Sequence, residues 1–561
     1  MYNKTMNKLK ILFIALLIGL ICANPVLAYP SNSVVRVGIM DQKYTTVEKS
    51  EVVIYGTKEL VLTDFATKEE IARIPEGAEL QIKRCDEKFE LYYIEPLTEI
   101  EMGAEIKNDF VITSPAGILG IKDLTRGGKP AQYRGEFRIL ACSEKPDKFC
   151  LINCLDVEYY LKGVVPCEMP VHFGLEALKA QAVAARVYSL TPRTKVSRCY
   201  DVVDSVASQV YNGYNRESEI SNKAIDETHG IVALHNDNMI VAVFCSTAGG
   251  YIESYANTFS DTVTGQFPSP NRNYLISKPD LPEIKPLNKE EDAFKFYSTK
   301  PLSYDINSPL YRWTKSWTKN ELQNILKSTL IVQSKTGFVE PKLTNSDDFG
   351  NLKDIRVLKR GDSGKIITME VVTDKNTFTI GKELVIRRVF QKEGKALPSA
   401  NVVFKTECES ESDKEWSKIT AYGGGYGHGC GLSQFGARYM AQNCNLPFDI
   451  ILKHYYNSII LGTKPVELSK TQVTQCFYQP FKKAVLVIPD RKDVSKITLK
   501  INEQELTLDL SANKRSEIDI SKYINSHELN TISFNPLIQP KYDRHHHVQP
   551  VRSIKLYIRI E

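Results

Sequence analysis

The sequence predicts a mixed α+β fold, with a β-rich section at the N-terminal end and antiparallel strands at the C-terminal end. Residues 33–124 alternate apolar and polar side chains in short runs separated by glycine and charged turns, which is typical of strands. Helical and strand-like patterns are mixed from about 126 to 465. After residue 475 the alternation is strict, as in half-buried antiparallel strands. With 561 residues, the chain exceeds what one hydrophobic core usually supports.

The N-terminal residues 1–28 have the features of a secretory signal peptide. Lys4, Lys8 and Lys10 precede an apolar stretch over 11–23, and Val26-Leu27-Ala28 resembles a cleavage site. An apolar run of this length is shorter than the ~20 residues that span a bilayer. We therefore expect an extracytoplasmic protein, secreted or associated with the cell wall, cleaved after Ala28. The alternative is a protein anchored to the membrane by an uncleaved N-terminal segment.

Four sections are predicted to follow one another: the signal peptide, a β-rich section over 29–125, a mixed region over 126–465, and a β-sandwich-like domain over 475–561. Within the mixed region, periodicity predicts helices near 174–190, 219–228, 318–327 and 431–443. The proline-rich and charged residues from about 267 to 300 are expected to form an exposed excursion. The C-terminal strands are interpreted either as a carbohydrate-binding module or as a passive or protein-contacting domain.

The run YLKGVVPCEMPVHFGLEALKAQAVAARVYSL, residues 160–190, places an acidic side chain next to an alanine-rich helix. Pro166 and Pro170 bracket Glu168, and proline restricts both its own φ angle and the residue before it. The pattern therefore predicts that Glu168 lies on a stiff, non-helical loop. Its apolar neighbours Val164 and Val165 favour a raised pKa through loss of hydration.

Several motifs resemble the stage II sporulation protein D / LytB amidase-enhancer family (SpoIID/LytB). They occur in the family's order, over roughly residues 33–465: YRGEFRIL (133–140), LINCLDVEYYLKGVVPCEMP (151–170), SQVYNGY (208–214), FCSTAGGYIES (244–254), YRWTKSWTKNEL (311–322) and GGGYGHGCGLSQFGARYMA (423–441). The resemblance implies a bacterial cell-wall protein. Sporulation members are similar to lytic transglycosylases that cut peptidoglycan glycan strands, and LytB-type members enhance a wall amidase.

The resemblance makes Glu168 the expected catalytic residue, acting as acid and then as base. A lytic transglycosylase needs one carboxylate, because the 6-hydroxyl of the muramic acid attacks C1. A hydrolase would need a second acid, for which Asp204, Asp226 and Glu253 are the alternatives. A non-catalytic enhancer that binds peptidoglycan or an amidase is the other hypothesis.

Further substrate contacts are expected from the SQVY segment and from the glycine-rich stretch over 423–431. Gln209 and Tyr211 supply an amide and a ring suited to a glycan groove. Ser433 and Gln434 open a helix just after the glycines, where the backbone can approach a sugar closely. His428 is expected to contact the substrate or to orient Glu168, and the alternative is that it satisfies backbone groups in a tight turn.

No cofactor and no metal site are predicted. Some family members hold a metal through Cys and His near the position of Gln209, whereas here only Cys199 is nearby. The consecutive His545, His546 and His547 are interpreted as an adventitious site at most, and Cys150 and Cys154 as small buried hydrophobes. A net charge of +5 over this length is too weak a signal for nucleic-acid binding.

Overall fold

The computed structural model describes residues 33–94, 101–191, 199–410, 415–469, 471–489, 496–510, 515–537 and 553–561. The α+β class is confirmed, with 20% of the chain in helices and 38% in strands. Among the described residues, no helix is both long and apolar enough to cross a membrane. The predicted signal peptide and the histidines 545–547 lie outside the described residues.

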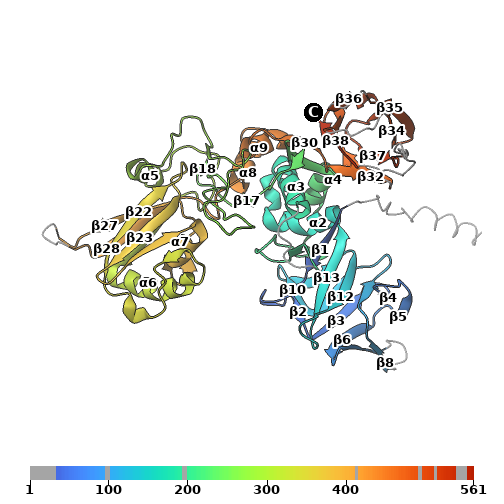
Figure 1. The fold of residues 1–561 in the computed structure, drawn as a ribbon, viewed down its shortest axis with the longest axis horizontal. Helices are drawn as coiled ribbons and strands as arrows, with labels where there is room; N and C mark the ends of the chain where they lie inside the picture. The colour runs from blue at the N-terminus through green and yellow to red at the C-terminus, as the bar shows by residue number, and fades with distance from the viewer. Residues whose placement is uncertain are drawn as a thin grey trace, which may run out of the picture.

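The N-terminal part is built from two sheets that pack against each other, at the bottom of Figure 1, and their strands are antiparallel except for β14, which pairs in parallel with β1. Phe89 from one sheet meets Phe110 from the other, with ring centroids 5.3 Å apart. Strand pairing continues past residue 125, where the sequence analysis places a boundary. The strands are β1 (Val34–Gly38), β2 (Glu48–Lys49), β3 (Glu51–Gly56), β4 (Leu60–Asp64), β5 (Glu70–Ile74), β6 (Glu79–Cys85), β7 (Lys88–Ile94), β8 (Glu101–Ile106), β9 (Phe110–Thr113), β10 (Leu119–Arg126), β11 (Lys129–Tyr133), β12 (Glu136–Ala141), β13 (Phe149–Asp156) and β14 (Val202–Val203).

Five helices form the centre of the molecule, where Figure 1 shows α3 beside α2, α4 and α8. They are α2 (Val157–Glu168), α3 (Leu175–Leu190), α4 (Glu219–Asp226), α8 (Gln434–Gln442) and α9 (Phe448–Tyr455). The helix predicted over 174–190 is confirmed as α3. Its alanines Ala177, Ala180 and Ala184 are buried, and their small side chains allow the neighbouring helices to approach closely.

A separate lobe extends from this centre, at the left of Figure 1, and contains a hydrophobic core of its own. Helix α5 occupies part of the predicted exposed excursion, but Ala293, Phe296 and Tyr297 of this helix are buried. The lobe's elements are β19 (Lys278–Pro279), α5 (Glu290–Tyr297), β20 (Trp313–Thr318), α6 (Lys319–Ser334), β21 (Val339–Glu340), β22 (Leu352–Arg360), β23 (Ile366–Thr373), β24 (Thr377–Gly381), α7 (Glu383–Val389), β25 (Gln391–Lys392), β26 (Lys395–Ala396), β27 (Val402–Glu407) and β28 (Lys418–Gly423).

The C-terminal strands take part in two sheets. One of these sheets also contains strands from the centre of the molecule, so the C-terminal strands are not separate from it. The order of this sheet is β16-β15-β30-β38-β33-β36, and β38 pairs directly with β30. The other sheet has the order β32-β37-β34-β35. The strands of these two sheets are β15 (Ile231–His235), β16 (Asn238–Met239), β30 (Ile460–Thr463), β31 (Val466–Leu468), β32 (Val473–Tyr478), β33 (Ala484–Ile488), β34 (Lys496–Ile501), β35 (Gln504–Asp509), β36 (Ser516–Asp519), β37 (Leu529–Phe534) and β38 (Ile554–Ile560). Three further short strands form separate pairs: β17 (Phe244–Cys245) with β29 (Leu432–Ser433), and β18 (Tyr251–Ile252) with β19.

Candidate active site

Glu168 is the last residue of α2, and not part of a loop as the proline pattern predicts. The helix continues through Pro166, and only Met169, which precedes Pro170, has the extended backbone expected there. A proline in a helix removes one backbone hydrogen bond and costs about 3 kcal/mol. Burial of Tyr160, Leu161, Val164 and Val165 on the same helix offsets this cost. The prediction of a non-helical loop is therefore wrong, because tertiary packing overrides the local preference.

The Glu168 carboxylate accepts a hydrogen bond from the backbone N–H of Val210, with an Oε1–N distance of 2.6 Å. Burial raises the pKa of the Glu168 carboxyl to about 6, and the Val210 hydrogen bond opposes this rise only in part. No cationic side chain in the described ranges forms an ion pair with it. At neutral pH a useful fraction of the carboxyl is therefore protonated, as general acid catalysis requires.

Gln209 and Tyr211 flank Val210, but both side chains point into the protein. The Gln209 amide oxygen accepts a hydrogen bond from the Tyr160 hydroxyl at 3.2 Å, and its Nε2 atom is buried without a partner in the described part of the chain. The Tyr211 hydroxyl donates to Asn153 Oδ1 at 2.8 Å, and the ring lies in the core beside Tyr160. Both residues fix the segment that presents the Val210 N–H to Glu168. Their role as substrate contacts stays a prediction.

His428 has both ring nitrogens engaged by backbone groups. Its Nδ1 atom accepts from the Cys430 N–H at 3.1 Å, so Nε2 carries the proton and donates to the Phe244 carbonyl at 2.8 Å. Burial, followed by the charge of Lys365, lowers the pKa of His428 to about 3. The imidazole is thus neutral and holds the tight turn in place, which is the alternative role expected for it.

Ser433 and Gln434 lie at the start of α8 and are buried. The Ser433 hydroxyl caps the helix by accepting from the Gly436 N–H, and it donates to Asp305 Oδ1 at 2.6 Å. The Gln434 amide donates to Gln181 Oε1 of α3 at 3.2 Å. Within the described residues, no hydrogen bond joins either side chain to Glu168, and their role as substrate contacts stays a prediction.

Asp305 is a buried residue that the sequence analysis missed. Its Oδ2 atom accepts from the Gly249 N–H at 2.7 Å, so one carboxyl joins the lobe to both Ser433 and the Gly249 segment. Burial, followed by the charge of Asp280, raises the pKa of Asp305 to about 7. Nothing in its sequence surroundings indicates this position, because the partners are more than 50 residues away along the chain.

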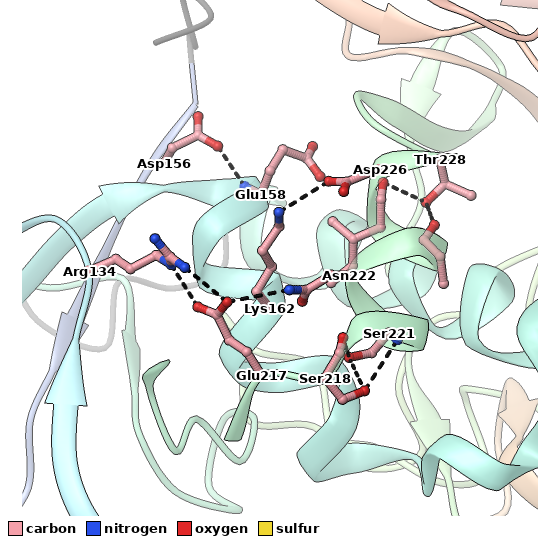
Figure 2. Close-up of polar contacts among 12 residues, drawn as sticks. Arg134, Asp156, Glu158, Lys162, Glu217, Ser218, Ser221, Asn222, Asp226 and Thr228 are labelled. Carbon is pink, nitrogen blue, oxygen red and sulfur yellow. Dashed lines mark hydrogen bonds and ion pairs between the residues drawn. The ribbon is translucent and has the colours of Figure 1, made fainter. Parts of the chain in front are cut away.

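The three alternatives for a second catalytic acid each have a structural partner. Asp204 is buried and pairs with Arg126 Nε at 2.7 Å. Asp226 pairs with Lys162 at 3.2 Å, as Figure 2 shows. Glu253 is buried and accepts from the Ser363 hydroxyl at 2.7 Å. None of them has a hydrogen bond or ion pair with Glu168 in the ranges that the structure describes.

The described residues contain no group of three or more histidines, cysteines, aspartates or glutamates able to hold a metal ion. Cys199 packs beside Cys150 and Cys154 in a small apolar cluster.

Comparison with known proteins finds similarity over the segment that contains Glu168 and Val210. Residues 145–235, which contain Glu168 and Val210, match the family model described as stage II sporulation protein. Residues 145–235 are thus similar to a SpoIID/LytB domain. The chain resembles the amidase enhancer of Bacillus subtilis, with 33% identity over 308 residues. It also resembles stage II sporulation protein D of the same organism, with 26% identity over 335 residues.

The matches cover different shares of this chain and of its relatives. They span 53% of this chain and 39% of the amidase enhancer, and 57% of this chain and 78% of stage II sporulation protein D. A protein of Brachyspira hyodysenteriae without an assigned role is 28% identical over 315 residues. Residues 258–431, which contain the lobe, match a domain of unknown function (DUF8618). The lobe is thus a recognised unit inserted before α8.

Proposed function

We propose that this chain is a peptidoglycan lytic transglycosylase that cuts glycan strands during cell-wall remodelling in sporulation, with Glu168 as the catalytic residue. The single observation that carries the proposal is a half-buried carboxyl at the end of α2 whose pKa is raised to about 6 and which has no ionic partner in the described ranges. Similarity to stage II sporulation protein D of Bacillus subtilis supports the role in sporulation.

The proposed reaction needs only one proton-transferring group. Glu168 donates its proton to the oxygen between N-acetylmuramic acid and N-acetylglucosamine, and that bond to C1 breaks. The 6-hydroxyl of the muramic acid then bonds to C1 and returns its proton to Glu168. The products are a 1,6-anhydromuramyl end and a free 4-hydroxyl, and no water is consumed. The engagement of Asp204, Asp226 and Glu253 elsewhere favours this route over hydrolysis with two carboxylates.

The second candidate function is a non-catalytic enhancer of a cell-wall amidase. The 33% identity to the amidase enhancer of Bacillus subtilis favours it. Both functions place the protein outside the cytoplasm, and we propose export through the N-terminal segment, either with cleavage or with that segment kept as an anchor. Carbohydrate binding by the C-terminal strands stays a prediction.

Mass spectrometry of peptidoglycan incubated with the purified protein tests the proposal. We expect 1,6-anhydromuramyl products, and a rate that falls as pH rises above about 6, because Glu168 must begin protonated. Glu168→Gln should lower the rate by about 10² to 10⁴. Glu219→Gln, an exposed carboxylate in the first turn of α4, is the matched control and should leave the rate unchanged.

Three outcomes separate the alternatives. Anhydro products at the wild-type rate from Glu168→Gln would disprove the catalytic assignment. Reducing ends in place of anhydro sugars would indicate a hydrolase. If the wild-type protein releases neither product but increases the rate of a purified amidase, the enhancer function is correct.

A further inference from the structure

Two cysteines face each other across the hairpin that leads into the catalytic helix. Cys142 follows β12, and Cys150 is the second residue of β13. Leu140 pairs with Cys150, and the Cys142 N–H donates to the Lys148 carbonyl at 3.0 Å. Cys142 is therefore two residues from the position opposite Cys150, so both side chains lie on the same face of the sheet as diagonal neighbours.

The sulfur atoms of this pair are in contact, with a Sγ–Sγ distance of 3.7 Å. Both cysteines are partly exposed, whereas Cys154, four residues further along β13, is buried. A disulfide needs about 2.05 Å between the sulfurs and has Cβ atoms about 3.5–4.5 Å apart. The two sulfur atoms must approach each other by about 1.6 Å for the bond to form, and the Cys142–Lys148 backbone hydrogen bond holds the two segments together beside them.

The surroundings favour a structural pair over a reactive thiol. Met40, Leu140 and Tyr200 pack around Cys150 in an apolar cluster that also contains Cys199. Burial raises the pKa of Cys150 to about 12 and raises that of Cys142 as well. Only a small fraction of each thiol is ionised at neutral pH, so the pair should react slowly with an oxidant. Cys142 lies just beyond the end of β12, outside the paired strands, which favours it for the first attack.

We propose that Cys142 and Cys150 are a disulfide-forming pair that closes when the chain meets a thiol oxidant. The Cys142 thiolate attacks a disulfide of the oxidant and releases one oxidant thiol. Cys150 then attacks Cys142 Sγ in the mixed disulfide and releases the second thiol. Two S–H bonds are lost, one S–S bond forms, and the two electrons reduce the oxidant's disulfide. The bond would fix the start of β13, the strand that runs directly into α2 and Glu168. The pairing does not depend on the proposed transglycosylase activity.

Peptide mapping of the full chain tests the pairing. The protein is held in a buffer of oxidised and reduced glutathione, denatured, alkylated and digested with trypsin without reduction. Trypsin cleaves after Arg138, Lys148 and Lys162, so Cys142 and Cys150 lie on different peptides, 139–148 and 149–162. We expect these two peptides to be joined, with fragmentation placing the bond at Cys150 and not at Cys154. Dithiothreitol should separate them.

Variants give the controls for this experiment. Cys142→Ser should abolish the joined peptide and leave Cys150 open to alkylation, and Cys150→Ser should do the same for Cys142 if the first variant does not fold. Cys85→Ser removes an exposed cysteine elsewhere and should leave the joined peptide intact. If Cys85 carries glutathione while Cys142 and Cys150 are both fully alkylated, the proposal is wrong. A bond from Cys150 to Cys199 would also overturn it.

Discussion

The two ends of helix α2 carry glutamates whose pKa values are shifted in opposite directions. Glu158, in the first turn, is buried and forms two contacts with Arg186, at 2.8 and 2.6 Å. Although burial alone would raise the pKa of Glu158, Arg186 and His229 bring it below the usual range. Glu168, in the last turn, has only the Val210 N–H, and its pKa is raised to about 6. The helix dipole adds to the contrast, since it favours a carboxylate at the N-terminal end and opposes one at the C-terminal end.

This difference separates a carboxylate that holds the fold from one that is available for proton transfer. Arg186 also donates to the Ile231 carbonyl of β15, and the Gly230 N–H donates to Glu158. The N-terminal end of α2 is thereby tied to α3 and β15 at once. An ionised, fully paired Glu158 anchors the helix, so the opposite end can hold a carboxyl in a less favourable environment.

The largest effect should follow from removing residues 472–561. This deletion removes β38, the partner of β30, and also Tyr478, whose N–H donates to the His229 carbonyl next to the Glu158 site. We expect a protein that is insoluble or loses its cooperative thermal transition, measured by circular dichroism and size-exclusion chromatography. A soluble truncated protein with the wild-type melting curve would instead establish the C-terminal strands as an independent unit.

Removal of the Glu158 carboxylate should be the next largest effect. Glu158→Leu leaves Arg186 buried without its counter-charge, and breaking a buried pair in this way costs about 3–5 kcal/mol in free energy of unfolding. Urea denaturation measures the loss. The double variant Glu158→Leu/Arg186→Met removes both charges and should recover most of the stability. A loss below about 1 kcal/mol in the single variant would contradict the anchoring role.

A structural feature can be predicted from the sequence when the residues that cause it lie close together along the chain. Helix α3 was predicted correctly because its periodicity is contained in one segment. Glu168 was singled out by its neighbours, but its backbone was predicted wrongly, since the packing that keeps Pro166 helical comes from residues far along the chain. Arg186 offered a signal that was not used, namely a charge on the apolar face of a helix.

The inserted lobe shows a second limit. Periodicity can predict a strand, but it does not say which hydrophobic core that strand joins. The lobe buries Trp317, Leu326 and Phe378 in a core of its own. The C-terminal strands, in contrast, share the main core with the helices. The position of Asp305 could not be predicted either, because its contact with Ser433 forms only in the folded chain.

Glu168→Gln should stabilise the protein at alkaline pH while removing activity. The folded protein holds the Glu168 proton up to about pH 6, compared with an ordinary value of 4.5, so wild-type stability falls as pH rises through this window. The amide removes that penalty and gives at most about 2 kcal/mol above pH 7, since one pKa unit corresponds to 1.36 kcal/mol. At pH 4 the two proteins should be equally stable.

Urea denaturation of wild type and Glu168→Gln at pH 4 and pH 8 measures this difference, with Glu219→Gln as the control that should show no pH-dependent difference. Equal stability of Glu168→Gln and wild type at pH 8 would contradict the raised pKa.

The smallest effect should come from the second ion pair of α2, between Lys162 and Asp226 of α4. Figure 2 shows the two side chains bridging the helices, 3.2 Å apart. The Asp226 side chain is 59% exposed, in contrast to the buried Glu158, so water and salt screen the attraction.

We expect a coupling free energy of about 1 kcal/mol or less between Lys162 and Asp226 from a double-mutant cycle of Lys162→Met and Asp226→Asn in urea denaturation. The coupling should decrease further in 1 M salt, where the Debye length is about 3 Å. A coupling above about 2 kcal/mol that salt does not change would mean that this pair also anchors α2, and the contrast between the two ends of the helix would no longer rest on Glu158 alone.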